Sequence, residues 1–250
     1  MSRFILIIQF LTRIPININI DFKEGDLPKG IIYFPIVGLI IGIFNVLIYF
    51  LASKIAGGLF PLIASITANI IITGGLHVDG LADTCDGVYS SRKKDKMLEI
   101  MRDSRVGTNG VIAIFLDLAL RITLLANLNE SYILKAIVIS PILGRIMLAL
   151  LAFKSNYARN DSGLGNLFIG KITLYRILTS SIVSFIIITI LMGFKSIIVI
   201  GTIIILSVLY KRYMNSKIGG MTGDTLGAGN EIAEIISILI IVAMRRYTLI

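Results

Sequence analysis

Three carboxylates separated by four and then three residues lie near the middle of the sequence, at Asp79, Asp83 and Asp86. On an α-helix this spacing places all three on one face. Unpaired like charges on one helix face repel each other, and a divalent cation that prefers oxygen ligands, such as Mg²⁺, would relieve that repulsion. The spacing therefore indicates a metal site formed by these three residues. The competing interpretation is a solvated acidic face, which apolar Leu81 between the carboxylates disfavours.

The same stretch, residues 74–110, also holds groups that can transfer protons or bind phosphate. The chain's single histidine, His77, precedes Asp79 by two residues, and Asp103 follows further along. Together with Asp86 they are candidates for the general base of a reaction. The alternative for His77 is a structural histidine at the edge of an apolar segment. The arginines of the stretch are candidates for binding phosphate oxygens, although a basic run here also fits contact with anionic lipid: Arg92, Arg102 and Arg105.

A glycine-rich stretch, residues 215–231, surrounds a further carboxylate. Five glycines flank Asp224, and Glu231 and Glu234 follow at the expected start of the last helix. Acidic residues at a helix start are explained by the helix dipole alone, but five glycines around Asp224 are not. We therefore expect Asp224 to complete the site from a second part of the chain, as a metal ligand or by orienting an attacking hydroxyl. Glu231 is expected behind it, in contact with substrate.

A third polar stretch, residues 155–171, combines glycines with Arg159, Asn166 and Lys171. Backbone N–H groups of such a loop can cradle a phosphate, and Asn166 and Lys171 are its candidate side chains for that contact. An ordinary polar loop is the alternative.

The composition defines the class of protein that must position these groups. The chain has 250 residues, of which 56% are hydrophobic, and its mean hydropathy is +0.89. These values predict a polytopic all-α membrane bundle, taken as one domain over residues 1–250. The first residues lack a small-residue cleavage site, so no cleavable signal peptide is expected. The net charge of +9 gives no reason to expect nucleic acid as a partner, because the basic residues follow the membrane pattern described next.

Six or seven segments are predicted to span the lipid bilayer, and the N-terminal segment is not. Residues 4–20 are interrupted by Gln9, Arg13 and Pro15, which favours an interfacial or re-entrant segment. The segment 30–53 contains Gly38 and Gly42, a spacing that allows close helix packing. The spanning segments are predicted at residues 30–53, 59–77, 107–128, 132–153, 177–193, 196–210 and 231–247.

Most of the 24 Lys and Arg residues fall in the N-terminal segment and in every second loop after it. This bias predicts that these segments face the cytoplasm, with the protein in the cell membrane. Nearly all of the acidic residues lie on the same side. A transporter or channel, the alternative from another class, would more often place its polar groups near the bilayer midplane.

Three charged residues are expected at membrane depth: Asp117, Arg121 and Arg145. Asp117 and Arg121 are four residues apart on a helix and can pair. A structural ion pair within the bundle is the preferred interpretation, and contact with a charged substrate is the alternative.

Carboxylates for Mg²⁺ and cations for phosphate on one face of a helical bundle indicate chemistry on a pyrophosphate. Asp83-x-x-Asp86-Gly87 with Arg92 loosely resembles the start of the CDP-alcohol phosphotransferase signature, but the expected Ala-Arg pair is missing. A membrane phosphotransferase that acts on a lipid is therefore kept as an alternative.

The sequence more closely resembles the cobalamin synthase family (adenosylcobinamide-GDP ribazoletransferase, cobalamin-5′-phosphate synthase). The resemblance covers nearly the whole chain and rests on FLTRIP at 10–15, FPIVGLIIG at 34–42, GGLHVDGLADTCDG at 74–87, LEIMRDSRVGTNG at 98–110, YAR with GLGNLFIGK up to 171, and GGMTGDTLGA at 219–228. It implies that a ribose hydroxyl of α-ribazole, or of its 5′-phosphate, attacks the pyrophosphate of adenosylcobinamide-GDP and that GMP leaves. Mg²⁺ is the implied cofactor. The oligomeric state and any contact with other cobamide-assembly enzymes stay open.

Overall fold

The computed structural model describes residues 2–21, 23, 25–160 and 163–247. In this part of the chain all regular structure is helical, and one isolated β-bridge joins Tyr157 to Met221. The all-α prediction is therefore confirmed. The helices, in chain order, are α1 Ser2–Leu11, α2 Asp26–Gly30, η1 Ile31–Tyr33, α3 Phe34–Ser53, α4 Phe60–Thr73, α5 Leu76–Val88, α6 Lys94–Ile100, α7 Thr108–Ala126, α8 Glu130–Ala152, η2 Leu164–Leu167, α9 Leu174–Met192, η3 Gly193–Lys195, α10 Ser196–Ile218 and α11 Gly223–Arg246.

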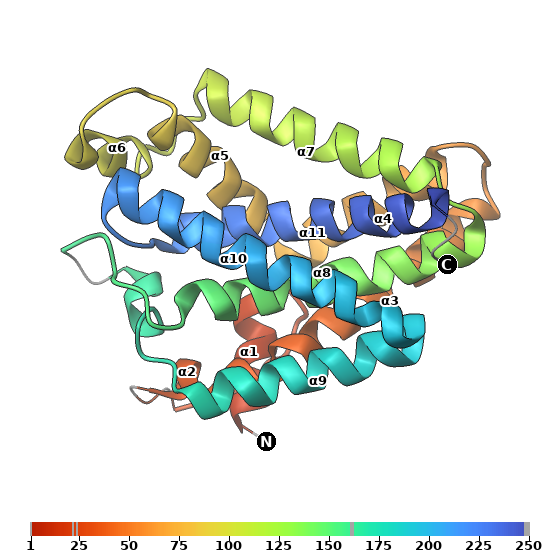
Figure 1. The fold of residues 1–250 in the computed structure, drawn as a ribbon, viewed down its shortest axis with the longest axis horizontal. Helices are drawn as coiled ribbons and strands as arrows, with labels where there is room; N and C mark the ends of the chain where they lie inside the picture. The colour runs from red at the N-terminus through yellow and green to blue at the C-terminus, as the bar shows by residue number, and fades with distance from the viewer. Residues whose placement is uncertain (1, 22, 24, 161–162, 248–250) are drawn as a thin grey trace.

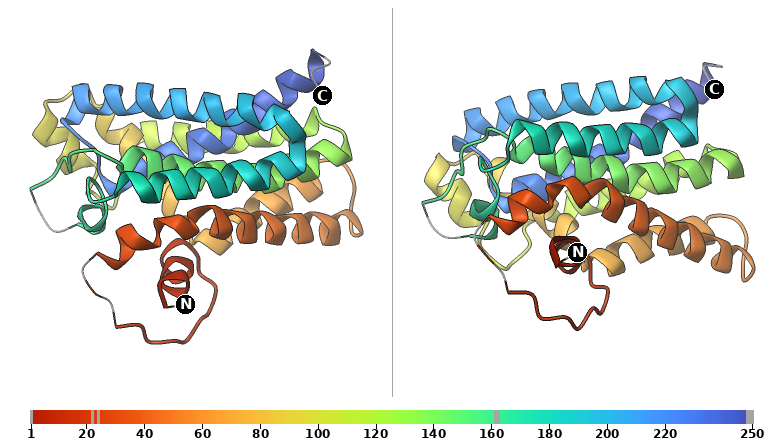
Figure 2. Two further views of the ribbon diagram at one scale, coloured as in Figure 1. Left: turned by 60° about the horizontal axis from the view of Figure 1, so that its bottom comes forward. Right: turned by 90° about the horizontal axis from the view of Figure 1, so that it is seen from below.

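Helix α8 lies at the centre of the bundle, where it packs against α3 on one side and α11 on the other (Figures 1 and 2). Its residues from Ile139 to Ala149 are buried on all sides, which its apolar sequence permits. The predicted close packing at Gly38 and Gly42 is confirmed, because a Cβ atom at either position would lie 2.7 or 2.8 Å from backbone atoms of α8. Two glycines one turn apart thus bring the backbones of α3 and α8 into contact.

Five helical stretches are long and apolar enough to cross a membrane, or up to six if the bent pair α4–α5 is counted as one broken span. One of the five, Leu174–Ile218, contains both α9 and α10, which meet at η3 and run in opposite directions (Figure 1). The sequence analysis counted these two helices as separate spans. The predicted count of spans and the count in the structure both describe a multi-pass helical membrane protein.

The segment predicted to span the membrane over residues 59–77 does not form one continuous helix. Helix α4 ends at Thr73, and α5 begins at Leu76 after a bend of 89°. Gly74 and Gly75 lie between them with φ angles of +66° and +70°. Two successive residues in this left-handed region stop a helix, and glycine adopts the conformation without steric cost. The bend directs α5 away from the axis of α4.

The polar segments gather at one end of the bundle, here called the polar end: α5, α6, residues 153–160 and 163–173, and residues 219–222 (Figure 1). The α3–α4 and α7–α8 connections and η3 lie at the opposite end. Helix α1 lies beside the bundle and packs against α2 and α3 (Figure 2).

Candidate active site

Helices α5 and α11 touch through glycine residues, and this contact places two acidic segments side by side. A Cβ atom at Gly80 would lie 2.7 Å from the carbonyl oxygen of Asp224, and one at Gly227 would lie 3.3 Å from the Cα atom of His77. The start of α11 is fixed by a capping box in which the backbone N–H of Thr225 donates to Thr222 Oγ1 (3.2 Å) and that of Thr222 donates to Thr225 Oγ1 (2.8 Å). Asp224 therefore stands in a rigid first helical turn.

A cavity of about 230 Å³ opens beside this contact, at the polar end. Helices α1, α3, α5, α8 and α11 and the loop after α8 all contribute to its wall. Most of the lining is aromatic or aliphatic, including Phe10, Phe34 and Phe168. The side chains on the wall that can bind charge or transfer a proton come from three segments far apart in the sequence: His77, Asp79, Arg159 and Asp224.

Arg159 lies on this wall, although the sequence placed it only in a loop that could cradle phosphate and did not mark it as a site residue. Its Nη2 atom lies 2.7 Å from Asp224 Oδ2, and its Nε atom is buried without a hydrogen-bond partner in the described structure. Backbone hydrogen bonds from Ala158 to Met221 and from Met221 to Asn156 fix the loop against the start of α11. The YAR motif was the available signal, but its pairing with Asp224 depends on this long-range contact.

Asp79, Asp83 and Asp224 form a group of neighbouring carboxylates, and Asp83 lies within electrostatic reach of both others. Asp86 is engaged differently. Its Oδ2 accepts the backbone N–H of Gly107 (2.6 Å) and its Oδ1 accepts that of Gly110 (2.9 Å), so it caps the start of α7 from a neighbouring helix.

Within the described residues, no group of three or more His, Cys, Asp and Glu side chains is arranged to hold a metal ion. The structure thus does not bring Asp79, Asp83 and Asp86 together as a ligand set, because both oxygens of Asp86 are bound to α7. The chemistry of Asp79, Asp83 and Asp224 still fits Mg²⁺, because carboxylate oxygens are hard ligands. Arg159 pairs with Asp224.

The other residues singled out from the sequence lie away from the cavity wall. Asp103 pairs with Arg105 at 2.6 Å on an exposed loop, and hydrogen bonds from Arg105 lower the pKa of Asp103 to about 2. A carboxyl with so low a pKa is a weak base. Arg102 lines a second, polar pocket of about 280 Å³ that shares Arg159 with the cavity. Arg92 and Lys171 are exposed, and Asn166 lies half-buried in η2.

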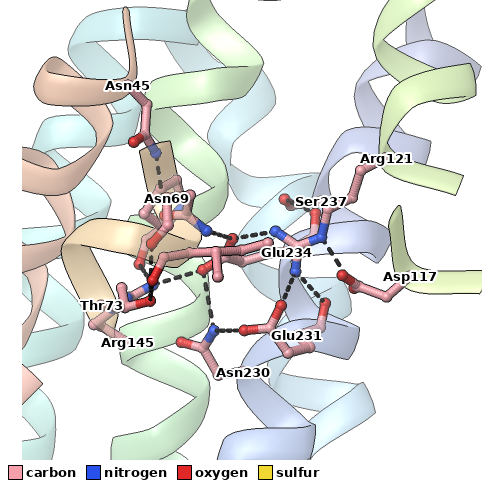
Figure 3. Close-up of polar contacts among 12 residues, drawn as sticks. Asn45, Asn69, Thr73, Asp117, Arg121, Arg145, Asn230, Glu231, Glu234 and Ser237 are labelled. Carbon is pink, nitrogen blue, oxygen red and sulfur yellow. Dashed lines mark hydrogen bonds and ion pairs between the residues drawn. The ribbon is translucent and has the colours of Figure 1, made fainter. Parts of the chain in front are cut away.

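Glu231 is buried in an ionic network inside the bundle instead of lining the cavity (Figure 3). Arg121 donates to Asp117 (3.0 Å), to Glu234 (2.5 Å) and to Glu231, and Arg145 donates to Glu234 at 2.5 Å. Asn69 of α4 and Asn230 of α11 also donate to Glu234. The predicted pairing of Asp117 with Arg121 is confirmed, and the network extends it across four helices.

These features define a multi-pass helical membrane protein with a charged, aromatic-lined cavity at one end of its bundle. The charged side chains in the middle of the bundle pair with one another. The carboxylates and the arginine that can take part in a reaction line the cavity.

Comparison with known proteins identifies the particular family. The family model described as cobalamin-5-phosphate synthase matches residues 3–242, so the chain belongs to that family. The chain is 51% identical to the adenosylcobinamide-GDP ribazoletransferase of Clostridium novyi, with 98% of each chain covered. It is 42% identical to the enzyme of that name from Clostridioides difficile (96% and 97% covered) and 39% identical to the one from Listeria monocytogenes (98% of each). The protein is therefore a transferase. No solved structure matches this chain.

Proposed function

We propose that this transferase joins adenosylcobinamide-GDP to α-ribazole, or to α-ribazole 5′-phosphate, and releases GMP. The observation that carries the proposal is the joint placement of Asp79, Arg159 and Asp224 on one cavity wall, in a chain similar over nearly its whole length to ribazoletransferases. A diphosphate carries negative charge, which Arg159 can bind, and an attacking hydroxyl must lose a proton, which a carboxylate can accept.

The proposed reaction forms one bond and breaks one. The ribose hydroxyl oxygen attacks the phosphorus on the corrinoid side of the diphosphate, and the bridging P–O bond breaks so that GMP departs with that oxygen. The hydroxyl proton passes to a group on the cavity wall. Of the four residues proposed as catalytic from the sequence, Asp103 and Asp86 are held by Arg105 and by the start of α7, and the Nε2 atom of His77 is buried. Asp224 is therefore the best placed acceptor.

Mg²⁺ is proposed as the cofactor, with Asp79 and Asp83 on α5 as its ligands. Bound there, it would neutralise charge that develops on the diphosphate during transfer. Asp224 from α11 faces the same space, and its pairing with Arg159 limits how much negative charge gathers without a cation.

We expect turnover by the purified protein to stop in EDTA and to return with Mg²⁺ or Mn²⁺, because the proposed ligands are carboxylate oxygens. The nucleotide released from adenosylcobinamide-GDP should be GMP, since attack occurs at the corrinoid-side phosphorus. Chromatography of the reaction mixture measures both results. Full activity in EDTA would remove Mg²⁺ from the proposal, and release of GDP would place the attack elsewhere.

We also propose that the polar end faces the cytoplasm in the cell membrane, as the basic residues predict. In a Cys85→Ser background, cysteines placed at Lys94, Lys171 or Lys217 should resist an impermeant maleimide in intact cells and react in inverted vesicles. Lys54→Cys, in the exposed α3–α4 connection at the opposite end, is the matched control and should react in intact cells. Labelling of the first three positions from outside would reverse the orientation.

A further inference from the structure

We propose that the 230 Å³ cavity is the binding site of the acceptor nucleoside, with a flat aromatic base held among Phe10, Phe34 and Phe168 and the ribose placed against Asp79 and Asp224. This inference rests on the proposed function and assigns one of its two substrates to a defined space. Phe10, Phe34 and Phe168 would then determine specificity for the base of the acceptor.

The size of the cavity excludes the corrinoid part of the donor and admits a nucleoside. A corrinoid ring with its amide side chains is several times larger than 230 Å³, whereas one fused heterocycle with a ribose is of comparable size. Ligand cavities bury most of the surface of the group that they hold. The corrinoid of the donor must therefore lie outside this cavity, whereas a nucleoside fits inside. The acceptor and donor constants compared below distinguish α-ribazole from the guanosine of the donor.

The lining matches an aromatic base attached to a sugar. Phe10 and Phe168 meet edge to face, with ring centroids 6.0 Å apart, and such rings favour stacked or edge-on contact with another aromatic ring. Phe34, Leu148 and Leu226 add to the apolar lining.

The polar side chains of the cavity gather where α5 meets α11. His77 is 4% exposed there, and its Nε2 atom is buried without a hydrogen-bond partner among the described residues. Because this atom has almost no surface open to the cavity, the groups that can bond to a ribose hydroxyl there are the carboxylates of exposed Asp79 and half-buried Asp224.

The geometry also brings the acceptor to the diphosphate. Arg159 borders both the cavity and the polar pocket formed with Lys94, Asp95 and Arg102. A diphosphate bound at Arg159 would therefore face the end of the cavity that holds Asp79 and Asp224. The attacking hydroxyl and the phosphorus would meet at that boundary.

The test compares substitutions in the wall of the cavity with a matched substitution elsewhere. Leu76→Trp places a large ring in the cavity from a residue that is 40% exposed, and Phe168→Leu removes an aromatic face while keeping the wall apolar. Leu174→Trp, at an exposed position on α9 that does not line the cavity, is the control. GMP release by the full chain in detergent gives the Michaelis constant for each substrate, and equilibrium dialysis measures binding of α-ribazole alone.

We expect both cavity variants to raise the acceptor KM by about tenfold or more, while the donor KM changes less than about twofold, because apolar contacts in a pocket contribute on this scale. Leu174→Trp should leave both constants unchanged. If the wild-type chain releases no GMP from the two substrates, the proposed function fails. If it does, but the cavity variants leave the acceptor KM unchanged or raise only the donor KM, the acceptor site lies elsewhere. Should Leu76→Trp fail to fold, Phe168→Leu and the dialysis measurement decide the result.

Discussion

Replacement of Asp224 by Asn is expected to lower turnover by about 10²- to 10⁴-fold, the range associated with loss of a positioned acid–base group. Asp224 lies on the cavity wall in the first turn of α11, and Arg159 holds its carboxylate at 2.7 Å. Asn keeps the shape of the side chain but can neither accept the proton of a hydroxyl nor act as a charged metal ligand. The measurement is the rate of GMP release at saturating concentrations of both substrates.

Glu130→Gln is the matched control, because Glu130 is an exposed carboxylate in the first turn of α8, at the opposite end of the bundle. Its turnover should stay within about twofold of wild type, since it contributes no group to the proposed chemistry. The Asp224→Asn protein must also remain monodisperse in detergent and still bind α-ribazole, which separates lost chemistry from lost folding. Normal turnover in this variant would exclude Asp224 from the reaction.

The sequence predicted the helical bundle well because long apolar segments are a local signal. The helices α3, α7 and α8 begin and end within a few residues of the predicted segments. The break between α4 and α5 was missed, although Gly74 and Gly75 were visible in the sequence. Glycine permits a left-handed turn without requiring one, so the surrounding packing decides whether the helix stops.

The site could be predicted in part, since spacing reveals which residues share a helix face but not what lies opposite. Asp79 and Asp83 follow from their position on α5. Two contacts of the site connect residues more than twenty positions apart: Asp86 accepts hydrogen bonds from Gly107 and Gly110, and Arg159 pairs with Asp224. A single sequence does not show which of its distant residues contact each other.

The burial of Glu231 and Glu234 inside the bundle also could not be predicted from their spacing. Their spacing at the start of a helix suggested capping or substrate contact, yet α11 begins at Gly223 and carries both residues into the core. There Glu234 is 1% exposed and contacts two arginines from different helices. A pair of glutamates on the buried face of a helix requires such partners, and Arg121 and Arg145 supply them.

Replacement of Glu234 by Gln is expected to destabilise the folded protein by about 3–5 kcal/mol, the typical cost of removing one partner from a buried ion pair. Arg145 is fully buried, its Nη1 donates to Glu234 at 2.5 Å, and its Nε and Nη2 atoms have no partner in the described structure. Without Glu234, this guanidinium would keep its charge in the core with no carboxylate in direct contact among the described residues. Equilibrium unfolding in mixed detergent micelles measures the change.

The double variant Arg145→Met/Glu234→Leu should recover a large part of that loss, because it removes the charge that the single variant leaves unpaired. Lys96→Gln, which breaks the exposed pair of Lys96 with Glu99, is the matched control and should leave the unfolding midpoint unchanged, since exposed pairs contribute little. Equal instability of the double and single variants would show that the carboxylate of Glu234 stabilises the bundle through Arg121, Asn69 and Asn230, and not by compensating Arg145.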